Sequence, residues 1–137
     1  MIKANAVTKV VDTSEGSLQI LRPISFEVKS GESIAIIGAS GSGKSTLLGL
    51  LAGLDQVTEG EIFLDGEALH SMTEEDRAIL RGNKVGFIFQ SFMLVQSLTA
   101  LENVMLPAEI AGLDNPKALA LDTVSYTHLT LPTTLVV

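Results

Sequence analysis

A glycine-rich run constrains this chain more than any other feature. The run lies between the apolar residues 34–37 and the leucine-rich residues 47–52. It fits the pattern G-x-x-x-x-G-K-[ST], which requires a strand before it and a helix after it. Its residues are Gly38, Ala39, Ser40, Gly41, Ser42, Gly43, Lys44, Ser45 and Thr46. We therefore expect a strand, a phosphate-binding loop and a helix over residues 34–52.

The residue types in this loop suit a nucleoside triphosphate. Glycines allow backbone N–H groups to converge on phosphate oxygens at a helix N-terminus, where the helix dipole favours anions. Lys44 is expected to reach the β- and γ-phosphates, and the Ser45 hydroxyl is expected to supply one ligand to Mg²⁺. The alternative is a Gly/Ser-rich loop with a chance Lys-Ser pair. It is disfavoured because every position of the pattern is filled and both flanks are correct.

Composition narrows the class of protein. The chain has 137 residues, 46% of them hydrophobic, which is enough for one core. A formal net charge of −7 disfavours a nucleic-acid-binding surface, because phosphate backbones require basic patches. The absence of cysteine excludes disulfides and thiolate metal sites. The sequence has neither a signal-peptide core nor an apolar run of membrane-spanning length, and we therefore expect a cytoplasmic protein.

Other segments predict further strands and helices. β-forming residues and turn signals predict strands in four further segments, at residues 2–11, 24–28, 60–64 and 85–89. The strand at 85–89 is expected to be buried. Thr73 with Asp76, and Thr99 with Glu102, have the spacing of helix-capping pairs. The helices that they predict cover about residues 73–81 and 99–107.

A second motif brings a family resemblance. Residues 84–94, K-V-G-F-I-F-Q-S-F-M-L, resemble the Q-loop of the ATPases of ATP-binding cassette (ABC) transporters. Residues 76–82 and 98–104 resemble the same family, in particular its lipoprotein-release and macrolide-export type. Gln90 follows Lys44 by 46 residues. The phosphate loop together with Gln90 at this spacing indicates the family far more specifically than the phosphate loop alone, which many unrelated enzymes share. The resemblance covers roughly residues 7–113.

The resemblance implies an α/β fold, the P-loop NTPase core of an ABC ATPase with an N-terminal antiparallel β portion. It places Gln90 near the γ-phosphate, where it would help to hold Mg²⁺ and the attacking water. A neutral amide can both donate and accept hydrogen bonds, which suits that role. The simpler interpretation is that Gln90 only caps the end of a strand.

The same resemblance implies partners. The segment from Ser91 to Leu98 would face a membrane permease subunit, and a second ATP-binding subunit would complete a dimer. Phe92, Met93 and Leu94 are either core residues or, if exposed, a docking patch. Family members often stack adenine on an aromatic residue after an early Thr-Lys pair. Here Val10 and Val11 follow that pair, and we therefore expect weaker adenine contact or looser base selectivity.

Other family motifs are absent after Gln90. The sequence holds no Leu-Ser-Gly-Gly-like signature and no apolar (Walker B) strand that ends in Asp-Glu. His128 comes too soon to be the switch histidine. Residues 124–133 are Thr-rich and uncharged, and they resemble a translated sequencing adapter. We therefore expect residues 1–122 to be the N-terminal part of an ABC ATP-binding domain and residues 123–137 to be a non-native tail. A natural β-rich C-terminus is the alternative.

The resemblance implies a function for the parent protein. It would use ATP and Mg²⁺, couple ATP hydrolysis to export or extraction of a lipophilic substrate, and lie on the cytoplasmic face of the inner membrane. This chain lacks the Asp-Glu pair and is expected to bind Mg-nucleotide without turnover. The alternatives are a non-hydrolysing nucleotide-binding fragment and a non-transport ABC ATPase.

Overall fold

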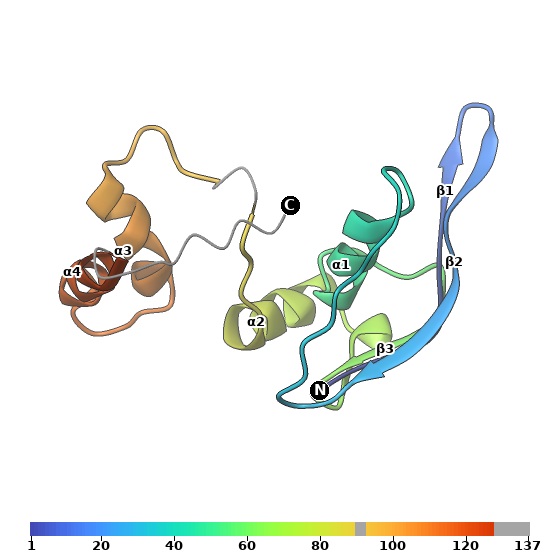
Figure 1. The fold of residues 1–137 in the computed structure, drawn as a ribbon, viewed down its shortest axis with the longest axis horizontal. Helices are drawn as coiled ribbons and strands as arrows, with labels where there is room; N and C mark the ends of the chain where they lie inside the picture. The colour runs from blue at the N-terminus through green and yellow to red at the C-terminus, as the bar shows by residue number, and fades with distance from the viewer. Residues whose placement is uncertain (90–92, 128–137) are drawn as a thin grey trace. The chain divides into compact units, whose positions relative to one another are not determined.

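The computed structural model describes residues 1–89 and 93–127. The chain divides into two compact units, Met1–Gly86 and a second unit that begins at Phe87. The elements of both are labelled in Figure 1. In the described ranges, no helix has the length and apolar character that crossing a membrane requires.

An antiparallel sheet in the order β2-β1-β3-β4 forms the base of the first unit. The strands are β1 (Ile2–Thr13), β2 (Gly16–Val28), β3 (Glu59–Leu64) and β4 (Glu67–Ala68). In Figure 1, β1 and β2 form a long hairpin. Both predicted strands of the hairpin are confirmed, and both are longer than predicted. The polar stretch between them pairs across the hairpin, with Asp12 opposite Ser17 and Thr13 opposite Gly16.

The core of this unit lies where one face of the sheet meets helix α1 (Lys44–Leu51) and the short helix η1 (Leu69–Ser71). Alternation in β3 places Ile62 and Leu64 in the core while Phe63 is only half-buried. Burying one such aliphatic side chain stabilises the fold by about 1.5–3 kcal/mol. The buried cluster comprises Ala4, Val7, Leu21, Leu47, Leu50, Leu51, Ile62, Leu64 and Leu69.

Three longer helices follow the sheet. They are α2 (Glu74–Lys84), α3 (Ala100–Ile110) and α4 (Pro116–Thr127). The predicted caps are confirmed, because the side chains of Thr73 and Thr99 accept hydrogen bonds from the backbone N–H groups of Asp76 and Glu102. Helix α4 was not predicted, and it packs against α3 (Figure 1). It continues past residue 122, where we placed the boundary of the native domain, and that boundary stays a prediction.

Two predicted strands are wrong. Residues 34–37 and 85–89 form no β-ladder with any residue in the described part of the chain. Ile37 and Ile88 are 91% and 103% exposed, so the segment at 85–89 is not a buried strand. A strand forms only where a neighbour satisfies its backbone groups, and both segments have the composition of strands of a parallel sheet, which require neighbours and covering helices.

Candidate functional site

The phosphate-loop motif runs into the first turn of α1, as predicted. Gly43 is the N-cap residue, in the left-handed region at φ 85°, and Gly41 has φ 77°. Such φ values are strained for residues with a Cβ, which explains why glycine occupies these positions. The Ser42 N–H donates to the Ala39 carbonyl at 3.2 Å, and the Leu47 N–H donates to the Gly43 carbonyl at 2.8 Å. The loop therefore turns tightly and ends at a free helix N-terminus.

Two glycines also allow close approach. A Cβ atom added at Gly43 would lie 2.9 Å from the carbonyl oxygen of Ile20 and 3.6 Å from Cδ1 of Leu21, so the end of the loop lies directly against β2. A Cβ atom added at Gly38 would lie 2.6 Å from Oγ of Ser42. A side chain at Gly38 would therefore require the Ser42 hydroxyl to move.

Lys44 curls back over the loop. Its Nζ atom donates to the carbonyl oxygens of Gly38 and Ala39 at 2.8 and 2.7 Å. Ser45, the second residue of α1, is exposed, and so are residues 38–42. The loop thus presents an ammonium group, a hydroxyl group and a helix N-terminus together, which is a combination that attracts polyanions.

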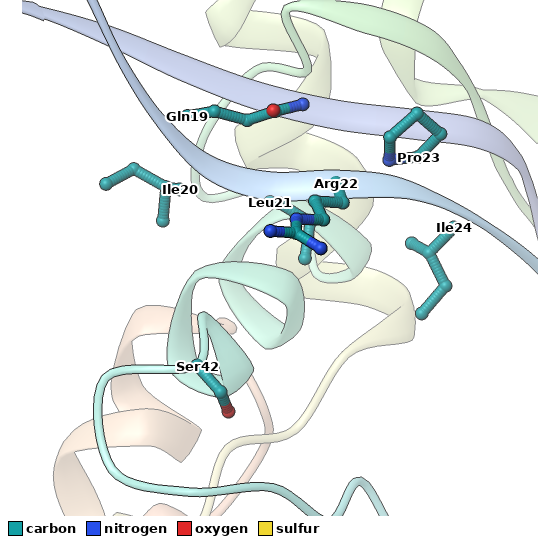
Figure 2. Close-up of a pocket in the computed structure, with 7 residues that line it drawn as sticks. All are labelled: Gln19, Ile20, Leu21, Arg22, Pro23, Ile24 and Ser42. Carbon is teal, nitrogen blue, oxygen red and sulfur yellow. The ribbon is translucent and has the colours of Figure 1, made fainter.

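A hollow of about 420 Å³ lies beside the loop (Figure 2). Ser42 contributes one wall, and six consecutive residues of β2 contribute the rest. These six are Gln19, Ile20, Leu21, Arg22, Pro23 and Ile24. Sequence analysis did not identify this segment, because nothing in a single strand indicates which loop folds against it.

Gln90 lies outside the described residues, as do Ser91, Phe92 and His128. The proposed metal and water contacts of Gln90 therefore stay predictions. Just before it, the rings of Phe87 and Phe89 stack with centroids 5.5 Å apart and an interplanar angle of 9°. This arrangement fits an extended backbone, in which side chains two residues apart point to the same side.

The loop at residues 93–98 is apolar, exposed and internally braced. Met93 and Leu94 are 64% and 66% exposed, so they are not core residues. The Asn103 side chain accepts from the Val95 N–H at 2.8 Å and donates to the carbonyls of Val95 and Leu98, both at 3.1 Å. Sequence analysis missed Asn103, although an asparagine inside a helix often bonds to neighbouring backbone.

Ion pairs anchor the end of α1 away from the phosphate loop. The Lys9 ammonium donates to Asp55 Oδ1 at 2.8 Å, and this hydrogen bond lowers the pKa of the Asp55 carboxyl. Arg81 donates to Glu74 at 2.9 Å, and the buried Arg77 also pairs with Glu74. The hydrogen bonds from Arg81 and then Arg77 lower the pKa of Glu74. Arg81 also donates to the carbonyl oxygen of Gly53, which joins α2 to the turn after α1, and none of these contacts involves the phosphate loop.

Comparison with known proteins points to one family. The sequence model of the ABC transporter family matches residues 21–133. The ABC transporter ATP-binding protein YbbA of Escherichia coli (strain K12) is 53% identical over 82% of this chain and 49% of the relative. The lipoprotein-releasing system ATP-binding protein LolD of Psychrobacter arcticus is 47% identical over 78% of this chain and 47% of the relative. The chain thus spans about half the length of these curated relatives.

Solved structures agree with this comparison. The dimeric bacterial ABC transporter cassette MJ0796 has a TM-score of 0.85 and 36% identity, over 95% of this chain and 58% of the cassette. A post-hydrolysis state of the same cassette, bound to ADP and Pi, has a TM-score of 0.84 and 35% identity over the same shares of the two chains. The predicted fold class is therefore confirmed.

Proposed function

This chain belongs to the ABC transporter family of ATP-binding domains, and from that premise we propose that it binds Mg-ATP at residues 38–46. The observation that carries the proposal is the geometry of the loop. Two glycines with positive φ lead into the N-terminus of α1, and the Lys44 ammonium lies over the loop carbonyls. Converging donors at a helix N-terminus favour a polyphosphate.

The residues of the loop fit a bound Mg-nucleotide. A Cβ atom added at Gly41 would meet nothing within 4 Å, so the loop backbone there is open to close approach by phosphate oxygens. Lys44 would exchange its two carbonyl contacts for phosphate oxygens, and the Ser45 hydroxyl would be a Mg²⁺ ligand, with Gln90 as a further ligand that also orients water. Oxygen donors of this kind suit Mg²⁺, which supplies charge neutralisation at the phosphates when bound.

For the parent protein, we propose an ATPase subunit that couples ATP hydrolysis to export or extraction of a lipophilic substrate. The relative LolD, whose name describes lipoprotein release, supports the substrate class. The dimeric cassette MJ0796 supports pairing with a second ATP-binding subunit. The exposed apolar loop at residues 93–98 supports docking of a permease there. Such a subunit would lie on the cytoplasmic face of the inner membrane.

For the chain itself, binding without turnover is the second candidate function. The sequence after Gln90 has no apolar strand that ends in Asp-Glu. Those carboxylates would position the attacking water and complete the metal site. We therefore expect this chain to bind Mg-nucleotide weakly and to release no phosphate at enzymatic rates.

A binding titration with a fluorescent ATP analogue and Mg²⁺ tests the proposal. The unsubstituted chain should bind, and Lys44→Ala should weaken binding roughly tenfold or more, because a charge-assisted contact to phosphate is lost. Lys29→Ala is the matched control, since it removes an exposed positive charge just after β2, and it should change affinity less than twofold. Absence of binding, or equal affinity of the Lys44→Ala variant, would contradict the proposal. Phosphate release at ordinary enzyme rates would contradict the second candidate.

A further inference from the structure

The hollow between β2 and the phosphate loop is continuous with the candidate phosphate site. Ser42 of the loop lines it on one side, and residues 19–24 of β2 line it on the other (Figure 2). The close approach of Gly43 to the Ile20 carbonyl joins the strand to the loop at this position. A molecule whose phosphates lie on the loop therefore has an adjoining space against β2 for its remaining part.

The lining of this hollow is apolar with one cation. Ile20 and Ile24 are half-buried, and Pro23 adds a further apolar surface. The Arg22 side chain is exposed and extends from β2 on the side of α1 (Figure 2). No residue that lines the hollow is aromatic.

Arg22 also differs from the other two arginines of the chain. Arg77 and Arg81 both pair with Glu74. Within residues 1–89 and 93–124, by contrast, no hydrogen bond or ion pair engages the Arg22 guanidinium. An unpaired guanidinium at the edge of an apolar hollow is available to a ligand, and its flat face can stack on an aromatic ring.

We propose that Arg22 recognises the base of the bound nucleotide by stacking its guanidinium plane on the purine ring. The inference rests on the proposed function, because the loop must hold the phosphates for the base to reach β2. Guanidinium planes stack on nucleobases, and every base offers such a face. Ile20 and Ile24 lie on the same side of β2 as Arg22 in Figure 2, one before it and one after it, and they would flank the ring. Stacking of this kind favours purines without distinguishing strongly between adenine and guanine.

Affinity measurements with ATP, GTP and tripolyphosphate test this role. In Arg22→Ala, binding of both nucleotides should weaken roughly three- to tenfold, because a cation–π contact is lost. Binding of tripolyphosphate should change less than twofold, since it has no base. Arg22→Lys keeps the charge and loses the plane, and it should therefore lose nucleotide affinity in the same way. Lys29→Ala again serves as the control, and thermal melting checks that each variant is folded.

The outcomes separate this inference from the proposed function. Unchanged nucleotide affinity in Arg22→Ala, with Lys44→Ala still defective, would overturn the role of Arg22 alone. Equal losses for ATP and tripolyphosphate would also overturn it, since Arg22 would then act on the phosphates through its charge. If the unsubstituted chain bound none of the three ligands, the proposed function would fail, and the role of Arg22 would fail with it.

Discussion

Gly43 carries two separate constraints at the residue scale. Its φ of 85° is strained for any residue with a side chain, and an added Cβ atom would lie 2.9 Å from the Ile20 carbonyl oxygen. The first constraint concerns the turn into α1, and the second concerns packing of the loop on β2. The motif in the sequence predicts the first constraint, whereas only the folded structure shows the second.

We therefore predict that Gly43→Ala destabilises the chain by about 1–3 kcal/mol, through backbone strain and the close contact. Gly82→Ala is the matched control, because Gly82 lies in α2 and an added Cβ atom would meet nothing within 4 Å. It should stabilise the chain by about 0.5–1 kcal/mol, as is usual when alanine replaces glycine inside a helix. Urea denaturation followed by circular dichroism measures both. Equal effects of the two substitutions would contradict the structure of the loop.

Hydrogen bonds between neighbouring residues define where helix α3 begins. Thr99 and Glu102 form the reciprocal capping box that their spacing predicts. Oε2 of Glu102 accepts from the Thr99 hydroxyl and from the Thr99 N–H, both at 2.7 Å. These two hydrogen bonds, the hydroxyl one first, lower the pKa of the Glu102 carboxyl from its ordinary value of 4.5. The ionised carboxylate is therefore favoured in the folded state.

This shift predicts a pH dependence. A carboxyl whose pKa is lower in the folded state adds stability above its unfolded pKa, and that stability is lost as the pH falls through the folded value. The contribution should therefore be complete at neutral pH and be lost as the pH falls below 4.5 and through the lower folded pKa. Thermal melting of the unsubstituted chain and of Glu102→Gln should differ at pH 7 and converge at pH 3. Because Asp55 and Glu74 titrate in both proteins, the comparison isolates Glu102. A difference that does not depend on pH would contradict the assignment.

The whole molecule exposes segments that have the composition of buried strands. Residues 34–37 and 85–89 are rich in β-branched and aromatic side chains, yet they form no β-ladder within the described ranges. Ile88 is 103% exposed and Ile37 is 91% exposed. Extended apolar segments with free backbone groups tend to pair with other chains.

We therefore predict that this chain associates in solution and that Ile88→Glu reduces the association. A charge on an unpaired strand-forming segment opposes edge-to-edge pairing. Ile79→Glu is the control, since Ile79 is 64% exposed on α2 and outside such a segment. Sedimentation and light scattering should show a clear decrease for Ile88→Glu and a smaller one for Ile79→Glu. Equal decreases would indicate general solubility rather than strand pairing.

The sequence by itself determined the features that depend on a few neighbouring residues. The phosphate loop, the caps at Thr73 and Thr99, and the strand segments at 2–11 and 24–28 follow from local patterns, because turns, caps and glycine positions involve contacts within about one or two helical turns. The family follows from the spacing of two short motifs. The tertiary structure alone decided that residues 34–37 and 85–89 are not strands, that Asn103 braces the 93–98 loop, and that Arg22 and Ser42 line the same hollow. A strand needs a partner and a hollow needs two walls, and both come from segments far apart in the chain, which periodicity within one segment does not specify.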